Sequence, residues 1–345
     1  MKEPIIDRRN FLAFSALGAW TVCKPQLLCR ETVSARTYVA LTHGESRAEN
    51  VYKALKLIEA EVRSKIAQAK RVIIKPNFVT TRRQLAATHV DCVEGILAFL
   101  APYTKGKQVI IAESPASAPA AEGFSNYGYY KLSKKYSVKF FDLDDGPVKK
   151  VYVIDHRFRP HAVRFSRLLC DPENYVISAA VMKTHDRAVV TLALKNVAVG
   201  GAIKEKGFQW GRRWGRRSDK PLVHGGRGNA GIHFNLFTLG IFAPPDLSVI
   251  DGFQGMEGNG PTGGDPVEHR VAVASTDWVA CERVALELMG VDFSYVGYLV
   301  FASENGLGEG DLSRIEVRGE PIKDHAKRYR LHDNIKSQLK WRERI

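Results

Sequence analysis

The sequence predicts an α/β protein with a mainly parallel sheet, helices covering both faces and long insert loops. Three observations support this class. Apolar runs of strand length recur along the chain, segments with helical spacing separate them, and the runs are almost continuously apolar. Strands buried on both faces have this composition, whereas strands with one solvated face alternate apolar and polar residues. A chain of 345 residues is long enough for one large hydrophobic core.

Ten segments have the length and composition of strands. They are residues 37–43, 71–77, 108–114, 138–144, 151–155, 174–182, 247–252, 270–276, 297–303 and 314–319. Apolar residues at helical spacing predict a long amphipathic helix from Ala48 to Ala69, and shorter helices fit residues 91–100 and 278–289. We expect one α/β domain over residues 36–320 and a basic, helical tail over residues 321–345.

Residues 1–35 have the pattern of a twin-arginine export signal. Arg8 and Arg9 stand just before an apolar run that begins at Phe11. The run is about a dozen residues, too short to span roughly 30 Å of hydrocarbon, and Val33-Ser34-Ala35 offers a small-residue cleavage site. The alternative is an N-terminal helix with chance arginines. We expect the twin-arginine export machinery to deliver the protein to the periplasm or outside the cell, with cleavage near Ala35.

The net charge of +14 is unevenly distributed. Residues 1–35 hold five basic and three acidic residues, so +12 remains after cleavage. Residues 204–227 (eight basic, two acidic) and 323–344 (eight basic, three acidic) supply nearly all of it. A localised positive field holds or steers an anionic partner. Because export separates the protein from the chromosome, we expect a small anionic ligand or an acidic protein partner, and no nucleic acid.

The cysteines form no cluster motif. Cys23 and Cys29 fall in the signal segment, while Cys92, Cys170 and Cys281 are far apart and no CxxC occurs. We therefore expect no iron–sulfur cluster on this chain. The three remaining thiols form either one disulfide or small buried side chains.

Polar residues recur where the apolar strands end. In open α/β sheets, ligands bind in the crevice outside the carboxyl ends of the strands. A single strand ends in polar residues merely because it reaches water, but five such ends favour a shared site. The five ends are Lys75-Pro76-Asn77, Glu113-Ser114-Pro115, Lys183-Thr184-His185, Asp251-Gly252 and Asp277. The last of these is also a favoured position for capping the helix that follows it.

Two further stretches add candidate residues. Lys195-Asn196 follows an apolar segment that should be buried, and a buried lysine needs a carboxylate, a phosphate or an anionic ligand to offset its desolvation. Six glycines between Gly252 and Gly264 surround Glu257 and Asn259, so this loop is expected to approach a ligand closely.

The glycine loop matches neither of two phosphate-binding motifs. Residues 258–263 satisfy GxGxxG, but a strand is expected after them where a dinucleotide-binding turn needs a helix. Residues 255–262 resemble a P-loop, yet Pro261 stands where the lysine belongs. The sequence also lacks GxSxG and HExxH, which excludes the common signatures of serine hydrolases and zinc proteases.

As a group, the motifs resemble the family called domain of unknown function 362. They are, in order, VIIKPNFV, MKTHDRAVVTLALKNVAVGG, DLSVIDGFQGMEGNGPTGG, ASTDWVACE and ENGLGEGDLSRIEVRGE. Members of that family are often exported by the twin-arginine route, and some carry ferredoxin-like cysteine motifs that this sequence lacks. The resemblance implies no reaction. It implies a shared site made by Lys75, Asn77, Lys183, His185, Lys195, Asn196, Asp251, Glu257 and Asn259.

Three functions are compatible with such a site. The first is an exported enzyme or cofactor-dependent protein acting on a small anionic substrate, with Lys183, His185, Lys195 and Glu257 as catalytic groups. The second is a non-catalytic binding or accessory protein for a periplasmic redox system. The third, a nucleic-acid binder, conflicts with the export signal.

Residues expected to bind the ligand are Lys75, Asn77, Asn196, Asp251 and Asn259. His224 and His233 are further candidates for metal binding or proton transfer.

The carboxylates allow two interpretations. In one, Asp251, Glu257 and His185 hold a divalent ion such as Mg²⁺, Mn²⁺ or Zn²⁺. In the other, which we favour, carboxylates neutralise the buried lysines without a metal. Both place the same side chains in a single pocket, namely Lys75, Lys183, Lys195, Asp251, Glu257 and Asn259.

The stretch QWGRRWGRRSDK repeats WGRR and lies between two candidate site loops. It contains little that would pack as a helix or strand, so we expect a long excursion near the mouth of the crevice. Its arginines, Arg212, Arg213, Arg216 and Arg217, would bind an anionic ligand, an acidic partner or an anionic membrane surface. A solvated basic loop is the alternative.

Overall fold

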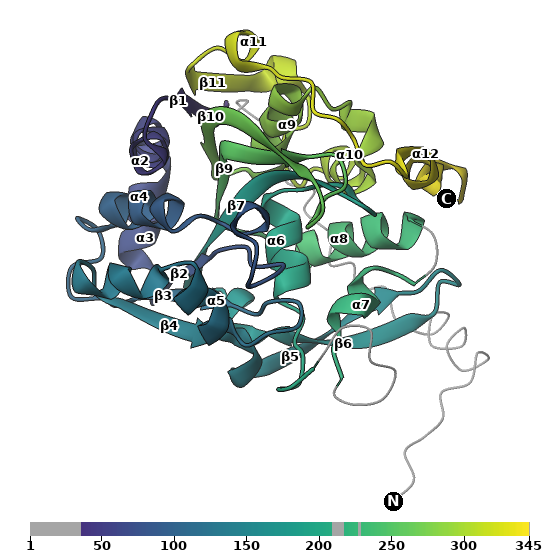
Figure 1. The fold of residues 1–345 in the computed structure, drawn as a ribbon, viewed down its shortest axis with the longest axis horizontal. Coiled ribbons are helices and arrows are strands. Elements are labelled where there is room, and N and C mark those ends of the chain that lie inside the picture. The colour runs from purple at the N-terminus through teal and green to yellow at the C-terminus, as the bar shows by residue number, and fades with distance from the viewer. Residues whose placement is uncertain (1–35, 209–216, 227–228, 345) are drawn as a thin grey trace, which may run out of the picture. The chain divides into compact units, whose positions relative to one another are not determined.

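A nine-stranded β-sheet forms the centre of the described chain, which in this computed structural model comprises residues 36–208, 217–226 and 229–344 (Figure 1). Residues 37–345 form one unit. The strands of the sheet are β1 (Thr37–His43), β2 (Arg71–Lys75), β3 (Val109–Glu113), β4 (Val138–Asp142), β7 (Asn174–His185), β8 (Val189–Thr191), β9 (Leu247–Glu257), β10 (Asp265–Ser275) and β11 (Ile315–Gly319). Their order is β11–β1–β10–β9–β7–β2–β3–β4, and β8 pairs with β7.

Most neighbouring strands run parallel. The pairs β11–β1, β9–β7, β7–β2, β2–β3 and β3–β4 are parallel. β10 is antiparallel to both of its neighbours, and β8 is antiparallel to β7. The predicted mainly parallel α/β sheet is therefore confirmed.

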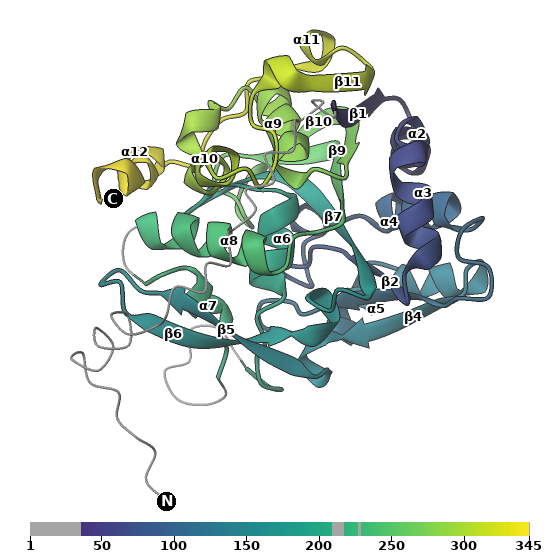
Figure 2. The ribbon, with the colours of Figure 1, turned by 180° about the vertical axis from the view of Figure 1, so that it is seen from behind.

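Helices cover both faces of this sheet (Figures 1 and 2). One face packs on α2 (Arg47–Leu57), α3 (Glu59–Gln68), α4 (Val90–Leu100) and α5 (Ala120–Asn126). The other packs on α6 (Ala193–Gly200), α8 (Ala230–Phe242), α9 (Trp278–Met289) and α10 (Gly297–Glu304). Successive residues of the central strands alternate between the two cores, as Val271 and Val273 do with Ala272 and Ala274. Both strand faces are buried, which explains why the strands lack polar alternation.

The remaining elements are short. β5 (Val148–Ile154) and β6 (Pro160–Ser166) form a separate antiparallel hairpin. Short α-helical turns are α7 (Lys220–Val223), α11 (Ile322–His325) and α12 (Ile335–Gln338). The 3₁₀ turns are Gln84–Ala86, Tyr129–Lys134, Leu143–Asp145, Arg167–Leu169, Phe293–Tyr295, Leu312–Arg314 and Leu339–Arg344. In the described ranges, no helix combines the length and the apolar character needed to cross a bilayer, and Cys92, Cys170 and Cys281 are free thiols.

Several predicted elements differ from the structure. Residues 297–303 form α10 rather than a strand, because a short apolar run does not distinguish a buried strand from a buried helix. The long helix predicted from Ala48 to Ala69 is interrupted at Ile58, whose φ of −118° and ψ of 21° separate α2 from α3. The tail beyond residue 320 is only partly helical, since α11 and α12 have four residues each.

The predicted glycine loop is partly strand. β9 continues to Glu257 and pairs with β10 along most of its length. Its glycines provide room for packing: a Cβ on Gly252 would lie 2.7 Å from a methyl group of Val271, and one on Gly255 would lie 2.2 Å from the Tyr329 hydroxyl. The many glycines correctly indicated close contacts of this backbone, but these contacts are made with the protein's own side chains.

Candidate functional site

The carboxyl ends of β2, β3 and β7 surround a small crevice. β2, β3 and β4 follow one another outward in the sheet, and the chain then returns to place β7 on the other side of β2. Such a reversal of strand order leaves an opening outside the strand ends. We call it the lysine crevice. Its volume is about 60 Å³, and its lining includes Asn77, Glu113, Lys183, His185, Lys195, Asn196 and Lys220.

Lys75 is fully buried at the end of β2. Its Nζ donates to Glu113 Oε2 at 2.8 Å, to Asn196 Oδ1 at 3.1 Å and to the Pro76 carbonyl at 2.9 Å. Burial lowers the pKa of Lys75, and the Glu113 carboxylate opposes that shift. A Cβ on Gly200 would lie 2.3 Å from Lys75 Cε, so α6 fits closely against this ammonium. Lys75 is thus satisfied by the protein itself.

Asn77 and Asn196 join the lysines of β2 and β7. Asn196 Nδ2 donates to the Lys75 carbonyl at 2.9 Å and to Ser178 Oγ at 3.0 Å, which fixes the orientation of the amide. Asn196 Oδ1 then accepts from Asn77 Nδ2 at 3.1 Å, and Asn77 Oδ1 accepts from Lys183 Nζ at 2.7 Å. Four of the predicted site residues therefore form one hydrogen-bonded network.

Lys183 and Lys195 are buried amines that form no ion pair with any described carboxylate. Among the described residues, Lys183 Nζ donates to Asn77 Oδ1 and, at 2.7 Å, to the Ala86 carbonyl. Lys195 stands in the first turn of α6 and lines the crevice, and its Nζ makes no hydrogen bond within the described ranges. Burial lowers the pKa of Lys195 to about 8, although the charge of the Asp186 carboxylate opposes that shift. Burial, helped by the charge of Lys195, lowers the pKa of Lys183 well below its ordinary value.

His185, the last residue of β7, is an uncharged donor. Its Nδ1 lies 3.0 Å from the backbone N–H of Arg187 and 3.3 Å from that of Ala188. Asp186 Oδ1 is also 3.0 Å from Nδ1, but two backbone donors at one nitrogen require that nitrogen to accept, which leaves the proton on Nε2. Burial and then the charge of Lys195 lower the pKa of His185 well below its ordinary value.

Sequence reasoning missed Lys220. Its Nζ donates to the carbonyls of Val199, Gly200 and Ala202 at 3.3, 3.1 and 2.7 Å, where α6 ends. A cation at this position satisfies carbonyls that have no partner inside the helix. Burial lowers the pKa of Lys220 to about 7. The residue lies in a charge run, and nothing in such a run distinguishes a buried lysine from a solvated one.

Glu113 was recognisable only as a polar strand end. The useful signal was its position, because β3 neighbours β2 and the two strands end in residues of opposite charge, Glu113 and Lys75.

Glu282 was missed entirely by the sequence analysis. Its Oε1 accepts from Leu194 N at 2.6 Å, and burial raises its pKa to about 7. The N-terminus of α6 is therefore occupied by a protein carboxyl group rather than open to a ligand.

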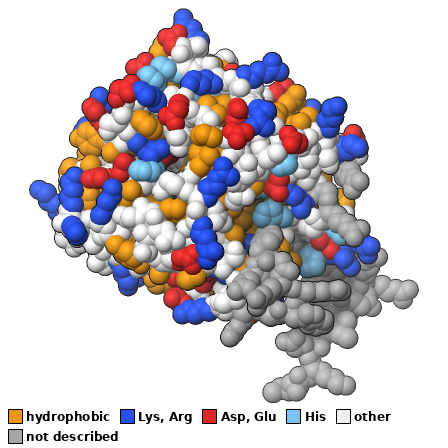
Figure 3. Space-filling model, viewed as in Figure 1, with side chains coloured by type: hydrophobic (Ala, Val, Ile, Leu, Met, Phe, Trp, Pro, Cys, Tyr) orange, Lys and Arg blue, Asp and Glu red, His pale blue; other side chains and the backbone are white. Residues whose placement is uncertain are grey.

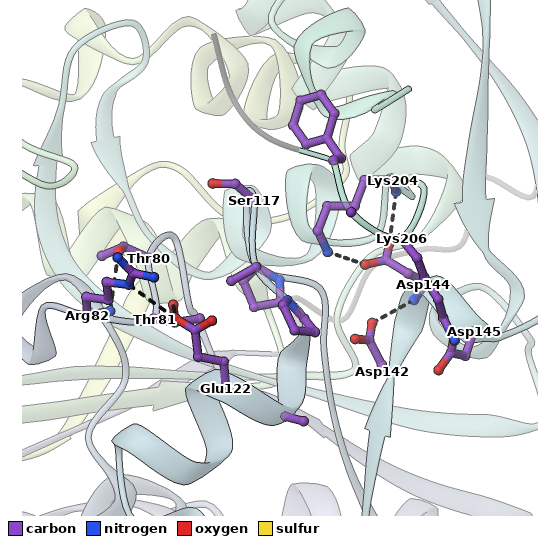
Figure 4. A pocket seen from close by; sticks show the side chains of 16 residues that line it. Thr80, Thr81, Arg82, Ser117, Glu122, Asp142, Asp144, Asp145, Lys204 and Lys206 are labelled. Carbon is purple, nitrogen blue, oxygen red and sulfur yellow. Dashed lines mark hydrogen bonds and ion pairs between the residues drawn. The ribbon is translucent and has the colours of Figure 1, made fainter. Parts of the chain in front are cut away.

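A larger cavity of about 880 Å³ lies along the same loops (Figure 4). Ser114 and Ala116 line the lysine crevice, whereas Pro115 and Ser117 line this cavity. Lys204 forms an ion pair with Asp144 there (Figure 4). The charged residues lining it are Arg82, Lys204, Lys206, Glu122, Asp142, Asp144 and Asp145. Cations and carboxylates nearly balance in this cavity, in contrast to the crevice.

The outer surface shows no comparable excess on the face drawn in Figure 3. There, Lys and Arg side chains are scattered among Asp and Glu side chains. The lysine crevice differs from this face in that it gathers Lys183, Lys195 and Lys220 around one carboxylate, that of Glu113.

Asp251 lies in a different cavity, of about 270 Å³. Its carboxylate accepts from Arg47 Nε at 3.2 Å and from the backbone N–H of Phe253 at 3.0 Å. Burial raises the pKa of Asp251, and Arg47 opposes that shift. The prediction that Asp251 shares a pocket with the lysines is wrong, because β9 does not end at this residue but continues to Glu257.

Glu257 and Asn259 contact the C-terminal segment instead of the lysines. Glu257 Oε2 accepts from the backbone N–H of Arg330 at 2.9 Å, and Asn259 Nδ2 donates to Asp333 Oδ2 at 2.8 Å. Both residues lie at the tip of the β9–β10 hairpin, well beyond the predicted strand end. The prediction that Glu257 and Asn259 share a pocket with the lysines is therefore wrong.

The expected metal set is not assembled. Asp251, Glu257 and His185 lie in three separate surroundings, and the described ranges contain no group of three or more His, Cys, Asp or Glu side chains placed to hold an ion. The alternative, neutralisation of the lysines by carboxylates, holds for Glu113 with Lys75 but not for Lys183 or Lys195. The predicted neutralisation by direct ion pairs therefore holds for one of the three lysines.

The histidine candidates have structural surroundings. His224 Nδ1 lies 2.9 Å from the Lys220 carbonyl, and its ring stacks on His185 with centroids 6.2 Å apart. His233 is buried against Tyr298 and Trp341. Asp277 caps α9 by accepting from Ala280 N at 3.0 Å.

Arg212, Arg213 and Arg216 lie outside the described residues. Arg217 is described, and its Nε donates to Asp219 Oδ1 at 3.0 Å. Its backbone N–H donates to Glu205 Oε2 at 2.9 Å. The idea of an arginine clamp stays a prediction.

Comparisons with known proteins agree with this arrangement of motifs. The family model described as "Domain of unknown function (DUF362)" matches residues 72–287. The chain is 28% identical over 224 residues to the thylakoid-associated protein sll1697 of Synechocystis, and the match spans 64% of this chain and 64% of that protein. A crystal structure from Thermotoga maritima matches with a TM-score of 0.35 and 14% identity over 62% of this chain and 52% of that one, a likeness that carries no argument. The length of the family match shows that the chain belongs to the domain of unknown function 362 family.

Proposed function

We propose that the protein binds a small carboxylate or phosphate anion in the lysine crevice. The observation that carries the proposal is the pairing deficit: Lys183 and Lys195 are buried, line the crevice and form no ion pair within the described ranges. A buried charge without a counterion is costly, and an anionic ligand offsets that cost.

The neutral groups around these amines favour an anion as well. His185 presents an N–H rather than a lone pair, and the amides of Asn77 and Asn196 are held in place by the Lys75 network. Donors held rigidly by the surrounding structure lose little entropy when they bind an acceptor ligand. The binding groups we assign are Lys183, Lys195 and His185, with Lys75, Asn77 and Asn196 as supporting residues.

A titration tests this proposal. Inorganic phosphate, acetate and pyruvate are titrated into the protein by calorimetry, and thermal melting is followed in parallel. We expect saturable binding of at least one anion, weakened at least tenfold by Lys183→Met. Lys53→Met, which removes an exposed lysine of α2, is the matched control and should bind with unchanged affinity. Absence of heat and of any melting shift with all three anions, or equal affinity in Lys183→Met, would overturn the proposal.

We further infer that the protein is exported and contacts an anionic membrane surface. Export rests on Arg8 and Arg9, which lie outside the described residues. The name of the Synechocystis relative associates that protein with thylakoids. In this chain, Lys323, Arg328, Lys336 and Lys340 are exposed in the C-terminal segment, and basic residues near a membrane attract anionic headgroups. Salt-sensitive cosedimentation with phosphatidylserine vesicles, weakened by replacing these four residues with Gln, tests the contact, and equal sedimentation of both proteins would contradict it.

A further inference from the structure

We propose that Lys195 acts as a nucleophile and forms an imine with the carbonyl carbon of a short 2-oxo acid. The carboxylate of that acid binds to Lys183 and His185. The inference rests on the anion site proposed above and names its ligand class and its chemistry.

Lys195 is distinguished by what its amine does not contact. The other buried lysines nearby are occupied: Lys75 has three acceptors, Lys183 has two and Lys220 has three carbonyls. Lys204 pairs with Asp144. Within the described ranges, Lys195 is the buried lysine whose Nζ makes no hydrogen bond, and it lines the crevice at 5% exposure. Its amine therefore reaches a ligand without first breaking an internal contact.

The environment of Lys195 also favours the neutral amine, which is the form that acts as a nucleophile. With a pKa of about 8, roughly one amine in ten is unprotonated at pH 7, against about three in ten thousand for an ordinary lysine. Desolvation and neighbouring cationic groups are the means by which proteins activate lysine amines for imine formation. The Asp186 carboxylate opposes this effect of burial on the pKa of Lys195, and Arg187 adds to it.

The size of the crevice limits the ligand. A volume of about 60 Å³ holds roughly four to six water-sized groups. A two- or three-carbon oxo acid has five or six non-hydrogen atoms and matches this space. Longer chains would have to extend out of the crevice.

The bond changes balance without an added oxidant or reductant. The lone pair of Lys195 Nζ attacks the carbonyl carbon, and the carbonyl oxygen becomes a hydroxyl group. That hydroxyl, formed when one Nζ proton passes to the carbonyl oxygen, leaves as water after taking a proton from the Lys183 ammonium while a C=N bond forms to Nζ. The remaining Nζ proton then passes to the Lys183 amine. The products are one imine and one water molecule for each amine and oxo acid.

Reductive trapping tests the proposal on the full-length mature protein. Pyruvate or glyoxylate is added, sodium borohydride reduces any imine to a stable secondary amine, and peptide mass mapping locates the adduct. We expect a single adduct, on Lys195, formed faster as the pH rises from about 6 to about 8. Lys195→Arg keeps a cation in the crevice and should lose the adduct.

Lys220 supplies an internal control. Its pKa, about 7, is lower than that of Lys195, so reactivity set by pKa alone would label Lys220 first. A main adduct on Lys220, on Lys183 or on exposed lysines overturns the assignment to Lys195. Binding of pyruvate without any adduct also overturns it, while leaving the anion site intact. If neither binding nor an adduct is found, the proposed function and this inference fall together.

Discussion

Lys75 Nζ and Glu113 Oε2 lie 2.8 Å apart at the ends of two neighbouring parallel strands, and both side chains are almost completely buried. Removing one partner of a buried ion pair leaves the other charge uncompensated, at a cost of about 3–5 kcal/mol. We expect Lys75→Met and Glu113→Gln each to lower the free energy of unfolding by about this amount, measured by urea denaturation.

The double variant, Lys75→Met with Glu113→Leu, removes both charges and should lose much less stability than the sum of the two single losses. Lys70→Met breaks the exposed pair with Glu173 and should change stability by less than about 1 kcal/mol. Additive losses in the double variant would show that the two groups do not act as a pair.

Gly200→Ala should disturb the same ammonium. The new methyl group would lie 2.3 Å from Lys75 Cε and 2.4 Å from its Nζ, so the lysine must leave its acceptors. Alanine is otherwise favoured over glycine in helices by about 1 kcal/mol. We therefore expect destabilisation in the wild-type background but stabilisation in a Lys75→Ala background. The same sign in both backgrounds, by urea denaturation, would argue against the contact.

Stability should depend on pH through Lys195. Its pKa is about 8 in the folded protein and near the ordinary lysine value of 10.5 in the unfolded chain, so the unfolded chain binds more protons between these values. The cost of burying this lysine is fully present below about pH 8 and is removed as the pH rises to about 10.5. Lys195→Met should therefore be more stable than the wild type at pH 7, by on the order of 3 kcal/mol, with the difference closing at alkaline pH. A difference that is constant with pH would contradict the shift.

Gln338 should support the turn that carries His185. Gln338 is fully buried, accepts from Val189 N at 2.7 Å and donates to the His185 carbonyl at 2.8 Å. Val189 has a φ of 66°, a backbone conformation that is strained for a β-branched residue. Gln338→Ala should cost about 1–3 kcal/mol of stability and weaken the binding of inorganic phosphate. Lys336→Ala, at an exposed position of the same helix, should do neither, and equal behaviour of the two variants would remove this role.

Export should require both arginines of the N-terminal motif. Replacing Arg8 and Arg9 with Lys keeps the charge and removes the arginine pair. We expect the variant to remain in the cytoplasm, as measured by cell fractionation and immunoblotting. Lys24→Ala is the control and should be exported. Export of the double-lysine variant at the wild-type level would exclude this route.

The fold was largely predictable because buried parallel strands leave a strong pattern in the sequence. β2, β3 and β7 were recognisable as apolar runs, and their polar ends correctly indicated Lys75, Asn77 and Lys183 as neighbours. α8 was not recognised, since it is apolar around most of its circumference and shows little helical periodicity.

The composition of the site was less predictable for a physical reason. A polar residue in an apolar run was taken as the end of a strand, which placed Asp251 at a strand end although it lies inside β9. Charge pairing depends on which strands are neighbours, and that is decided by contacts far apart in the chain. Glu113 and Lys220 could therefore be assigned only once β3 and α6 were placed.

The position of β1 decides when, relative to its synthesis, the chain can finish folding. β1 follows directly after the proposed signal, yet its partners are β10 and β11, from the other end of the sequence. Such non-local pairing is slow, since the closure entropy must be overcome before the contacts form. The N-terminal strand cannot enter the sheet until the ribosome has released nearly the whole chain. Folding of this protein is therefore completed after translation, and a translocation route that accepts a finished fold suits that order of events.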